Sequence, residues 1–344
     1  MQPQRRPSDV RAQIVRLLPA NTSDREGWAI DIYAAFAAQG IDPTTQNLCA
    51  TLAIAEQESG FRADPAVPGL GKIALAEIDR RAAQHDVPRL LVHAALLFTS
   101  PNGKSYDQRL AAARTEQDLS RIYEDFIGSV PLGKRLFAGD NPVHTAGPMQ
   151  VSVDFAQRYA RAHTYPYPYP ATGSIRHEVF TRRGGVYFGV AHLLDYQASY
   201  SRLLYRFADY NAGFYASRNA AFQQTASLAS GIPIALDGDL VRYDNTRQAS
   251  ATEVAVGALA RSLGMSESQI HRALQQSDSA KFEQSTIYQR VFALAEQQER
   301  RPLPRAVLPR ITLESPKITH KLTTEWFANR VDQRYQRCMA KASG

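Results

Sequence analysis

The sequence predicts a mainly α-helical protein, and two observations carry this prediction. Segments in which apolar residues recur at helical spacing cover most of the chain. Glycine, proline and polar clusters separate them, and a strand pairing is suggested only for residues 232–244, where Asp237-Gly238 lies between two apolar segments. The length of 344 residues allows one large domain or two smaller ones.

Each expected element has local signals. The third helix is expected to begin at Asp42 and Pro43, a capping residue before a proline, and to end at Gly60. The expected helices span residues 8–18, 23–39, 43–59, 72–84, 90–98, 106–113, 116–126, 152–161, 183–196, 252–263, 267–274, 281–299 and 323–342. Proline makes residues 165–170 (YPYPYP) and 302–316 extended. For YPYPYP a stiff spacer is favoured over a row of tyrosines that lines a sugar groove.

The third helix carries the candidate catalytic residue within residues 48–61 (LCATLAIAEQESGF). Glu58 falls in its last turn, where the carbonyl end of the helix and apolar neighbours favour a protonated carboxyl. A general acid that works near neutral pH needs that property. On this helix alone, a surface carboxylate at a frayed end is the favoured interpretation, and Glu56 is a competing candidate.

The charge of the chain limits the classes of partner that it can have, and its cysteine content bears on the cellular compartment. Lys and Arg outnumber Asp and Glu by 40 to 33, a dispersed excess that suits nucleic acid, a lipid surface or an anionic wall polymer without selecting one. No run of 18 apolar residues exists, so no membrane span is expected. Cys49 and Cys338 would form a disulfide in an exported protein and two buried thiols in a cytosolic one; the disulfide is modestly favoured.

Three motifs follow one another along the chain. They are the helix end Glu58-Ser59-Gly60-Phe61, residues 146–151 (AGPMQV) and residues 208–213 (ADYNAG), with a glycine-bearing helix before the third. This order resembles the soluble lytic transglycosylase and goose-type lysozyme superfamily. Its pattern is Glu-Ser-x-Phe, Gly-Leu-Met-Gln, a glycine-bearing helix and Tyr-Asn-Ala-Gly. The resemblance covers roughly residues 42–223 and implies a lysozyme-like helical core.

The resemblance also implies a role for each motif residue. Glu58 becomes the catalytic acid/base, and Glu56 is set aside because the acid directly precedes Ser-Gly-Phe in the motif. The remaining positions line the cleft, bind the sugar or orient the acid: Ser59, Gly147, Met149, Gln150, Tyr210 and Asn211. The implied enzyme is a peptidoglycan lytic transglycosylase that cuts the β-1,4 bond between N-acetylmuramic acid and N-acetylglucosamine. One Glu protonates the bridging oxygen and then accepts the 6-hydroxyl proton, so a 1,6-anhydro ring closes without water, metal or cofactor.

The chain departs from the superfamily in two places. Pro148 stands where the superfamily has Leu, and the segment from Phe61 to Gly147 is far longer than usual. The expected plan has N-terminal helices at 1–41, a catalytic domain at 42–225 with a helical insertion at about 65–140, and a mostly helical C-terminal extension at 226–344 that wraps back on the core. The insertion could gate the cleft, narrow the substrate range or block catalysis.

A closer resemblance covers nearly the whole chain. The segments ADPAVPGL, SPNGKSY, AGPMQVS, FADYNAGFYASRNAAFQ, ALDGDLVRYD and LESPKIT resemble the YaiW family of envelope lipoproteins. Members are exported and lipidated at a cysteine directly after the signal peptide. The resemblance implies an outer-membrane lipoprotein that faces the periplasm, with a leader and an anchoring cysteine expected ahead of residue 1. It also favours the Cys49–Cys338 disulfide, because the periplasm is oxidising.

The expected partners are peptidoglycan glycan strands, a membrane reached only through the lipid anchor, and an envelope protein as an open option; no nucleic acid is expected. Two alternatives to the transglycosylase remain. One is a non-catalytic envelope protein that binds glycan or a partner, which the insertion and Pro148 favour. The other is a muramidase that uses water. It requires a second carboxylate, for which Asp140, Asp195 and Asp209 are the candidates near the motifs.

Overall fold

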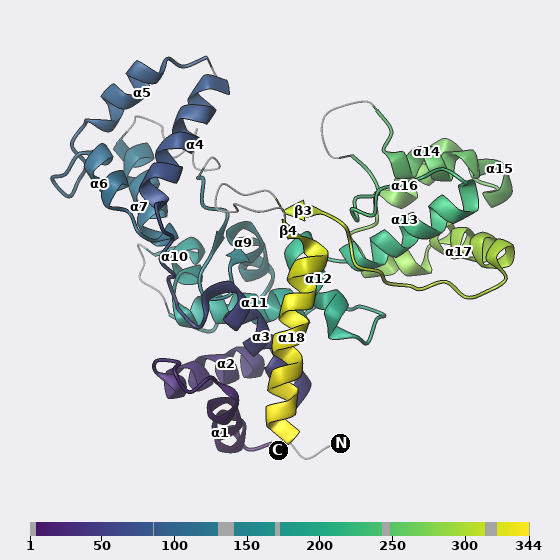
Figure 1. Cartoon of the computed structure of the whole chain (residues 1–344), viewed down its shortest axis with the longest axis horizontal. Helices are drawn as coiled ribbons and strands as arrows, with labels where there is room; N and C mark the ends of the chain where they lie inside the picture. Colours follow the sequence, from purple (N-terminus) through teal and green to yellow (C-terminus); the bar gives the residue numbers. More distant parts are fainter. Residues whose placement is uncertain are drawn as a thin grey trace. The chain divides into compact units, whose positions relative to one another are not determined.

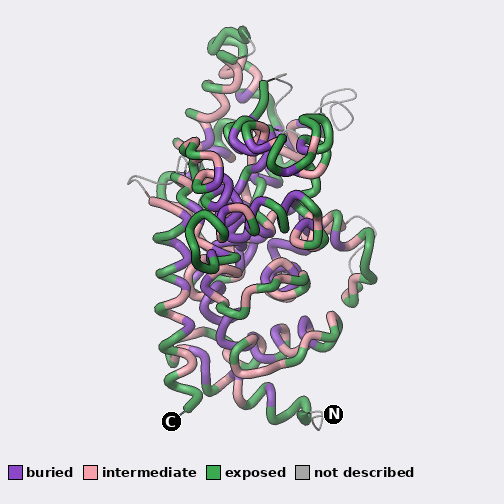
Figure 2. The backbone as a smooth tube through the Cα atoms, turned by 90° about the vertical axis from the view of Figure 1, so that its right-hand side faces the viewer, coloured by how far each residue is buried: buried purple, intermediate pink, exposed green. Residues whose placement is uncertain are grey.

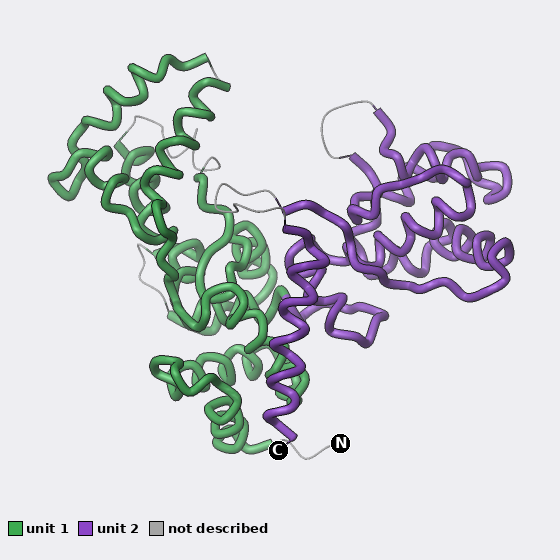
Figure 3. Tube along the Cα trace, in the orientation of Figure 1, with its two compact units in different colours: residues 1–192, 344 green, residues 193–343 purple. Residues whose placement is uncertain are grey.

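The computed structural model describes residues 5–84, 86–129, 141–168, 173–242, 248–313 and 322–343. Within these ranges helices dominate and strands form two short pairs, which confirms the predicted mainly α class (Figure 1). The chain divides into two compact units, residues 1–192 with the terminal residue 344, and residues 193–343 (Figure 3). The domain boundaries predicted at 41 and 225 were drawn from sequence motifs, whereas these units are defined by contacts within each unit, so the boundaries stay a prediction. The lysozyme-like core stays a prediction as well.

The first unit combines a helical framework with one short strand pair. Strands β1 (Thr145–Ala146) and β2 (Val151–Ser152) are antiparallel, with Thr145 opposite Ser152 and Ala146 opposite Val151. The helices are α1 (Pro7–Leu17), α2 (Arg25–Gln39), α3 (Thr45–Ser59), α4 (Leu70–Gln84), α5 (Arg89–Leu96), α6 (Tyr106–Ala112), α7 (Glu116–Ser129), α9 (Val153–Ala162), α10 (Ile175–Val179) and α11 (Arg182–Leu194), whose last two residues belong to the second unit.

The second unit has its own core, in which α12 (Leu203–Ala212) packs on α18 (Thr324–Ser343), and α13 (Ala216–Ser230) packs on α14 (Ala251–Ala258) and α17 (Thr286–Glu299). The striped colouring of α18 in Figure 2 reflects one buried face, formed by Phe327, Ala328, Val331 and Tyr335. The remaining elements are α15 (Ala260–Leu263), α16 (Glu267–Leu274), the 3₁₀ helix η2 (Ala280–Gln284), β3 (Thr312–Leu313) and β4 (Leu322–Thr323).

Glycine stops are confirmed, whereas one predicted helix start is wrong. Gly40 and Gly60 end α2 and α3 with φ of +64° and +58°, a left-handed conformation that glycine adopts at little cost. At the other end of α3, the Thr44 side chain accepts a hydrogen bond from the Asn47 N–H at 3.1 Å. Thr44 is therefore the cap, and the predicted start at Asp42 and Pro43 lies before the helix.

The predicted strand pair at residues 232–244 is also wrong in its described part, because residues 232–242 contain no strand. A helix side chain holds the Asp-Gly turn instead. Gln223 on α13 donates from Nε2 to Asp237 Oδ1 at 2.6 Å, and its Oε1 accepts from the Gly238 N–H at 2.8 Å. Among the described residues, no helix combines the length and the apolar character needed to cross a membrane.

Candidate functional site

The candidate acid Glu58 lies at the end of a buried helix in the first unit. Every residue of α3 from Leu48 to Ala55 is buried, whereas Glu58 is half-buried in the last turn. Directly after the helix, Phe61 packs edge-on against Trp28 of α2, with ring centroids 5.4 Å apart. This aromatic pair fixes the direction in which the chain leaves α3, and with it the position of the last turn.

Ser59 takes part in the turn that ends α3. Its side chain is buried, and the hydroxyl donates to the Ala55 carbonyl at 3.0 Å. The same oxygen accepts from the Arg62 N–H at 3.2 Å, while Arg62 Nε donates to the Ser59 carbonyl at 3.0 Å. Ser59 therefore shapes the segment beside Glu58, and its predicted contact with a sugar stays a prediction.

The second motif forms the turn between β1 and β2. Gly147 has a φ of +75°, and a Cβ atom there would lie 2.0 Å from the Val179 carbonyl oxygen, so only glycine fits. Gln150 is half-buried with a φ of +49°, and its Nε2 donates to the Gly147 carbonyl at 3.2 Å. Its Oε1 accepts from the Thr145 hydroxyl at 3.2 Å. The Gln150 side chain thus folds over the hairpin that carries it.

Two glycines of α11 let the β1–β2 hairpin pack closely against this helix. A Cβ on Gly189 would lie 2.4 Å from the Sδ of Met149, which is fully buried, and one on Gly185 would lie 2.3 Å from Cδ of Pro148. The spacing of these glycines is that of one helix face. The glycine-bearing helix noted in the sequence therefore supports the hairpin, and the Met149 side chain of the hairpin packs against it.

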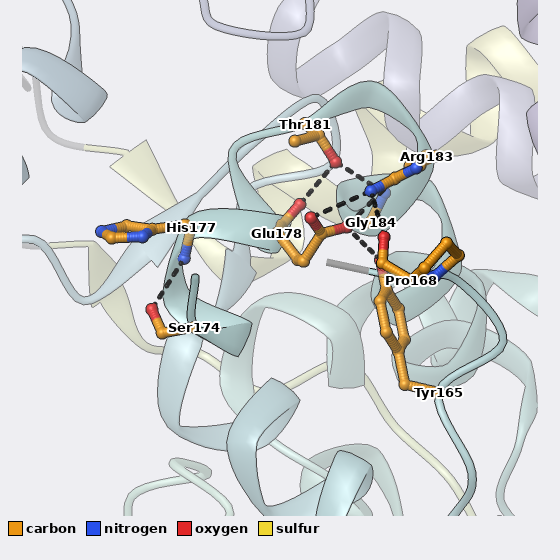
Figure 4. Close-up of polar contacts among 8 residues, drawn as sticks. All are labelled: Tyr165, Pro168, Ser174, His177, Glu178, Thr181, Arg183 and Gly184. Carbon is orange, nitrogen blue, oxygen red and sulfur yellow. Dashed lines mark hydrogen bonds and ion pairs between the residues drawn. The ribbon is translucent and has the colours of Figure 1, made fainter. Parts of the chain in front are cut away.

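A salt-bridged cluster fixes the turn before α11 (Figure 4). The buried Glu178 accepts hydrogen bonds from the Tyr165 hydroxyl at 2.7 Å and from Arg183 at 3.1 Å. The Tyr165 ring also stacks on Phe188, with centroids 5.2 Å apart. Burial beside Glu178 raises the pKa of Tyr165. These contacts favour the spacer interpretation of YPYPYP for Tyr165; residues 169–170 lie outside the described ranges.

The end of α3 and the hairpin share one framework. Arg182, the first residue of α11, forms ion pairs with Asp24 at 2.6 Å and Asp31 at 2.5 Å. Its guanidinium also lies 5.8 Å from the centre of the Trp28 ring that contacts Phe61. Contacts therefore run from the end of α3 through Trp28 to α11, and α11 carries the β1–β2 hairpin.

The long segment between the first two motifs is attached to the same region. On α7, Glu124 pairs with the His177 ring at 2.7 Å, and Ser120 accepts a hydrogen bond from Asn141 at 3.2 Å. Arg176 donates to the Val143 carbonyl at 2.8 Å. The insertion is thus held by α10 and by the chain that leads into β1. Its predicted effect on the cleft stays a prediction.

The third motif lies in the second unit, on α12. Tyr210 is buried, whereas Asn211 is exposed and its Oδ1 accepts from the Thr324 hydroxyl at 3.1 Å. Thr324 is the first residue of α18, so this bond joins the motif to the C-terminal helix. The predicted roles of Tyr210 and Asn211 toward Glu58 or a sugar stay predictions.

Asp209, the residue before Tyr210, is the centre of a buried polar cluster. It accepts hydrogen bonds from the hydroxyls of Tyr196 and Tyr200 and from the Ser217 N–H, the last at 2.7 Å. Burial raises the pKa of Asp209. Because its oxygens are enclosed by these donors, Asp209 is a poor candidate for the second carboxylate of a muramidase. Asp140 lies outside the described residues.

Two further features bear on the site. Cys49 and Cys338 are both disulfide-bonded, as the sequence predicted. Within the described ranges, no group of three or more His, Cys, Asp or Glu side chains is arranged to hold a metal ion.

Sequence reasoning missed Glu178 and the Asp209–tyrosine cluster. Arg183, five residues after Glu178, is the one local signal that could have indicated the first.

Comparison with known proteins identifies the family but not the reaction. No solved structure matches the chain. The protein named "Uncharacterized protein YaiW" from Escherichia coli (strain K12) is 54% identical over 331 residues, which are 96% of this chain and 90% of that protein. Residues 21–341 match the family described as "Protein of unknown function (DUF1615)". The chain therefore belongs to the DUF1615 family, together with proteins similar to YaiW.

Proposed function

We propose that the protein is a peptidoglycan lytic transglycosylase with Glu58 as its single acid/base. The observation that carries the proposal is the position of Glu58. It is half-buried at the end of an otherwise buried helix, and Phe61, Trp28 and Arg182 connect that helix end to the support of the hairpin that bears Gln150. A general acid that cuts a glycan must be held in a defined position, and these contacts hold the end of α3 that carries Glu58.

In the proposed reaction, the Glu58 carboxyl donates its proton to the oxygen between N-acetylmuramic acid and N-acetylglucosamine, and the bond from C1 to that oxygen breaks. The Glu58 carboxylate then accepts the proton of the 6-hydroxyl as O6 bonds to C1. The products are a 1,6-anhydromuramic end and an N-acetylglucosamine end with a free 4-hydroxyl. The proton returns to Glu58, so the step consumes no water.

The proposal includes a location in the cell envelope, as an outer-membrane lipoprotein that faces the periplasm. The disulfide supports this location, because disulfides persist in oxidising compartments and are rare in the cytosol. Peptidoglycan is the substrate that such a location would offer.

A non-catalytic glycan or protein binder is the second candidate, and two contacts favour it. The Asn211 side chain is bonded to Thr324, and the Ser59 hydroxyl is bonded within its own turn. Both motif positions thus have structural roles that a binder would also need. A muramidase is the third candidate; Asp209 is enclosed by tyrosines and a backbone N–H, so its second carboxylate would have to be Asp140 or Asp195.

The test compares the parent protein with Glu58→Gln and Glu56→Gln on purified peptidoglycan, with released products identified by mass. Glu56 is a matched control because it is a half-buried glutamate on the same helix. Release of anhydro-muropeptides by the parent and by Glu56→Gln, but not by Glu58→Gln, would support the proposal. Reducing-end muropeptides would show hydrolysis instead. Sedimentation of every variant with insoluble peptidoglycan, without any release, would leave the binder.

A further inference from the structure

The outer face of α5 in the insertion is apolar, the reverse of the usual arrangement in a soluble helix. Leu90, Leu97 and Phe98 are 81%, 68% and 70% exposed, and Leu91 and Ala94 lie on the same side. Leu90, Leu91 and Ala94 share one face of α5, and Leu97 and Phe98 directly follow its last residue, Leu96. We call these five residues the α5 stripe. Contiguous exposed apolar surface of this kind marks an interaction site.

The orientation of the stripe is fixed by polar contacts on the other side of α5. Asp79 of α4 forms an ion pair with Arg89 at 2.9 Å, and its Oδ1 lies 3.0 Å from Nε2 of the His93 ring. Leu96 points inward and is buried. At the end of the stripe, the Phe98 carbonyl accepts from the Tyr106 N–H at 3.2 Å. Helix α5 is thus held on the insertion with its apolar side facing solvent.

Basic side chains lie at both ends of the α5 stripe. Arg89 precedes Leu90 and is 73% exposed despite its ion pair. Lys104 is exposed on the turn that follows Phe98, where its carbonyl accepts from the Ser100 N–H at 2.8 Å. Between Leu70 and Arg114 the sequence holds seven Lys and Arg against four Asp and Glu. The segment that carries the stripe therefore has an excess of basic residues, and two of them, Arg89 and Lys104, are exposed at its ends.

We propose that the α5 stripe inserts into the surface of a membrane that contains anionic lipids. Protruding leucine and phenylalanine side chains bounded by bases match the boundary between acyl chains and negative headgroups. The helix lies on such a surface and does not span it. This contact is additional to the expected lipid anchor, which the sequence predicted as the only membrane attachment. It does not depend on the proposed glycan cleavage.

The test measures sedimentation of the chain with phosphatidylglycerol–phosphatidylethanolamine vesicles and with phosphatidylcholine vesicles. The parent is expected to bind the anionic vesicles more tightly and to lose affinity as salt rises. Leu90→Ser/Leu97→Ser/Phe98→Ser should weaken binding by about tenfold or more. Lys104→Glu should weaken binding to the anionic vesicles alone. The matched control is Leu228→Ser/Val254→Ser, which removes two exposed apolar side chains of the second unit and should bind like the parent.

Circular dichroism would confirm that all variants are folded, which is expected because the replaced side chains are exposed. Equal binding by the parent and the triple variant, or no binding by the parent to either vesicle, would overturn the proposal. Sedimentation velocity tests the alternative that a second copy of the chain binds the α5 stripe. If the parent self-associates and the triple variant is monomeric, the α5 stripe is an interface between copies of this chain and the lipid proposal is wrong.

Discussion

Gly185 lies directly against Pro148, since a Cβ atom on Gly185 would be 2.3 Å from Cδ of the proline ring. That carbon would also be 2.8 Å from the Val179 carbonyl oxygen, so it has rigid neighbours on two sides. Pro148 is the position at which the chain departs from the Gly-Leu-Met-Gln pattern. The departure is therefore accommodated by a glycine on the facing helix and leaves the β1–β2 pairing intact.

We predict that Gly185→Ala destabilises the protein by about 1–3 kcal/mol, because neither the proline ring nor the carbonyl can move away without shifting backbone. Urea unfolding would measure the change. Gly257→Ala is the matched control, since a Cβ atom on this helical glycine would have no neighbour within 4 Å, and the substitution should lose no stability. Equal losses from the two substitutions would contradict the explanation by close packing.

The sequence predicted what depends on local signals. Gly40 and Gly60 were expected to end helices because a left-handed residue is needed there, and both have positive φ. The start of α3 was missed because Asp42 and Thr44, two residues of types that cap helices, stand on either side of Pro43. The β1–β2 pair was missed because two residues per strand are too few to show a period.

The contacts of the candidate site were beyond sequence reasoning because they join distant residues. Asn211 bonds to Thr324, 113 residues later, and nothing near either residue indicates the pairing. Arg182 pairs with Asp31 across 151 residues. Such pairs depend on how helices pack, which periodicity does not specify. Motif order could indicate Glu58 and Gln150, but not that the Gln150 side chain folds over its own turn.

The Glu77 carboxylate should stabilise the insertion in a pH-dependent way. Arg80 and Arg81 hold it at 2.6 Å and 2.8 Å, and the hydrogen bond from Arg80 lowers its pKa from 4.5 to about 2. A lowered pKa means that the stabilisation is present above pH 4.5 and is lost as the pH falls toward 2. Thermal unfolding should therefore show that Glu77→Gln is less stable than the parent at pH 7. The difference in stability should vanish as the pH approaches about 2.

The expected difference for Glu77→Gln is small, about 0.5 kcal/mol, because water screens an ion pair with an exposed arginine. An Arg80→Gln background provides the control, since it removes the main partner and should shrink the effect of Glu77→Gln. A difference between Glu77→Gln and the parent that stays constant from pH 7 down to acid pH would show that the pair does not act through charge.

The disulfide should be inaccessible and stabilising. Cys49 is fully buried, so we expect no reaction of native protein with a thiol label under oxidising conditions. Cys49→Ala/Cys338→Ala should lower the free energy of unfolding by about 2–4 kcal/mol, because the bond restricts the unfolded chain. Reduction of the parent should move its unfolding midpoint toward that of the double variant. Labelling of both cysteines in native protein would rule the bond out.

Arg218 is a buried arginine at the centre of the second unit. Its guanidinium donates to the carbonyls of Ser277 and Ser279, the latter at 2.9 Å. It lies over the Tyr215 ring, 4.2 Å from the centroid, and over Phe282, 5.2 Å from that centroid. Burial lowers the pKa of Arg218. The planar, multiply donating group thus joins α13 to the chain before η2.

We predict that Arg218→Lys destabilises the protein by about 2–4 kcal/mol although the charge is kept. An ammonium group cannot reach both carbonyls at once or cover two rings, so hydrogen bonds to buried acceptors are lost. Urea unfolding followed by near-ultraviolet circular dichroism would measure the loss and the change around Tyr215. Arg272→Lys is the control: Arg272 is exposed, donates only to the Ser268 carbonyl in its own helix, and should change stability by less than about 0.5 kcal/mol. Similar small effects of both substitutions would show that charge alone, rather than the shape of the guanidinium, is what the core requires.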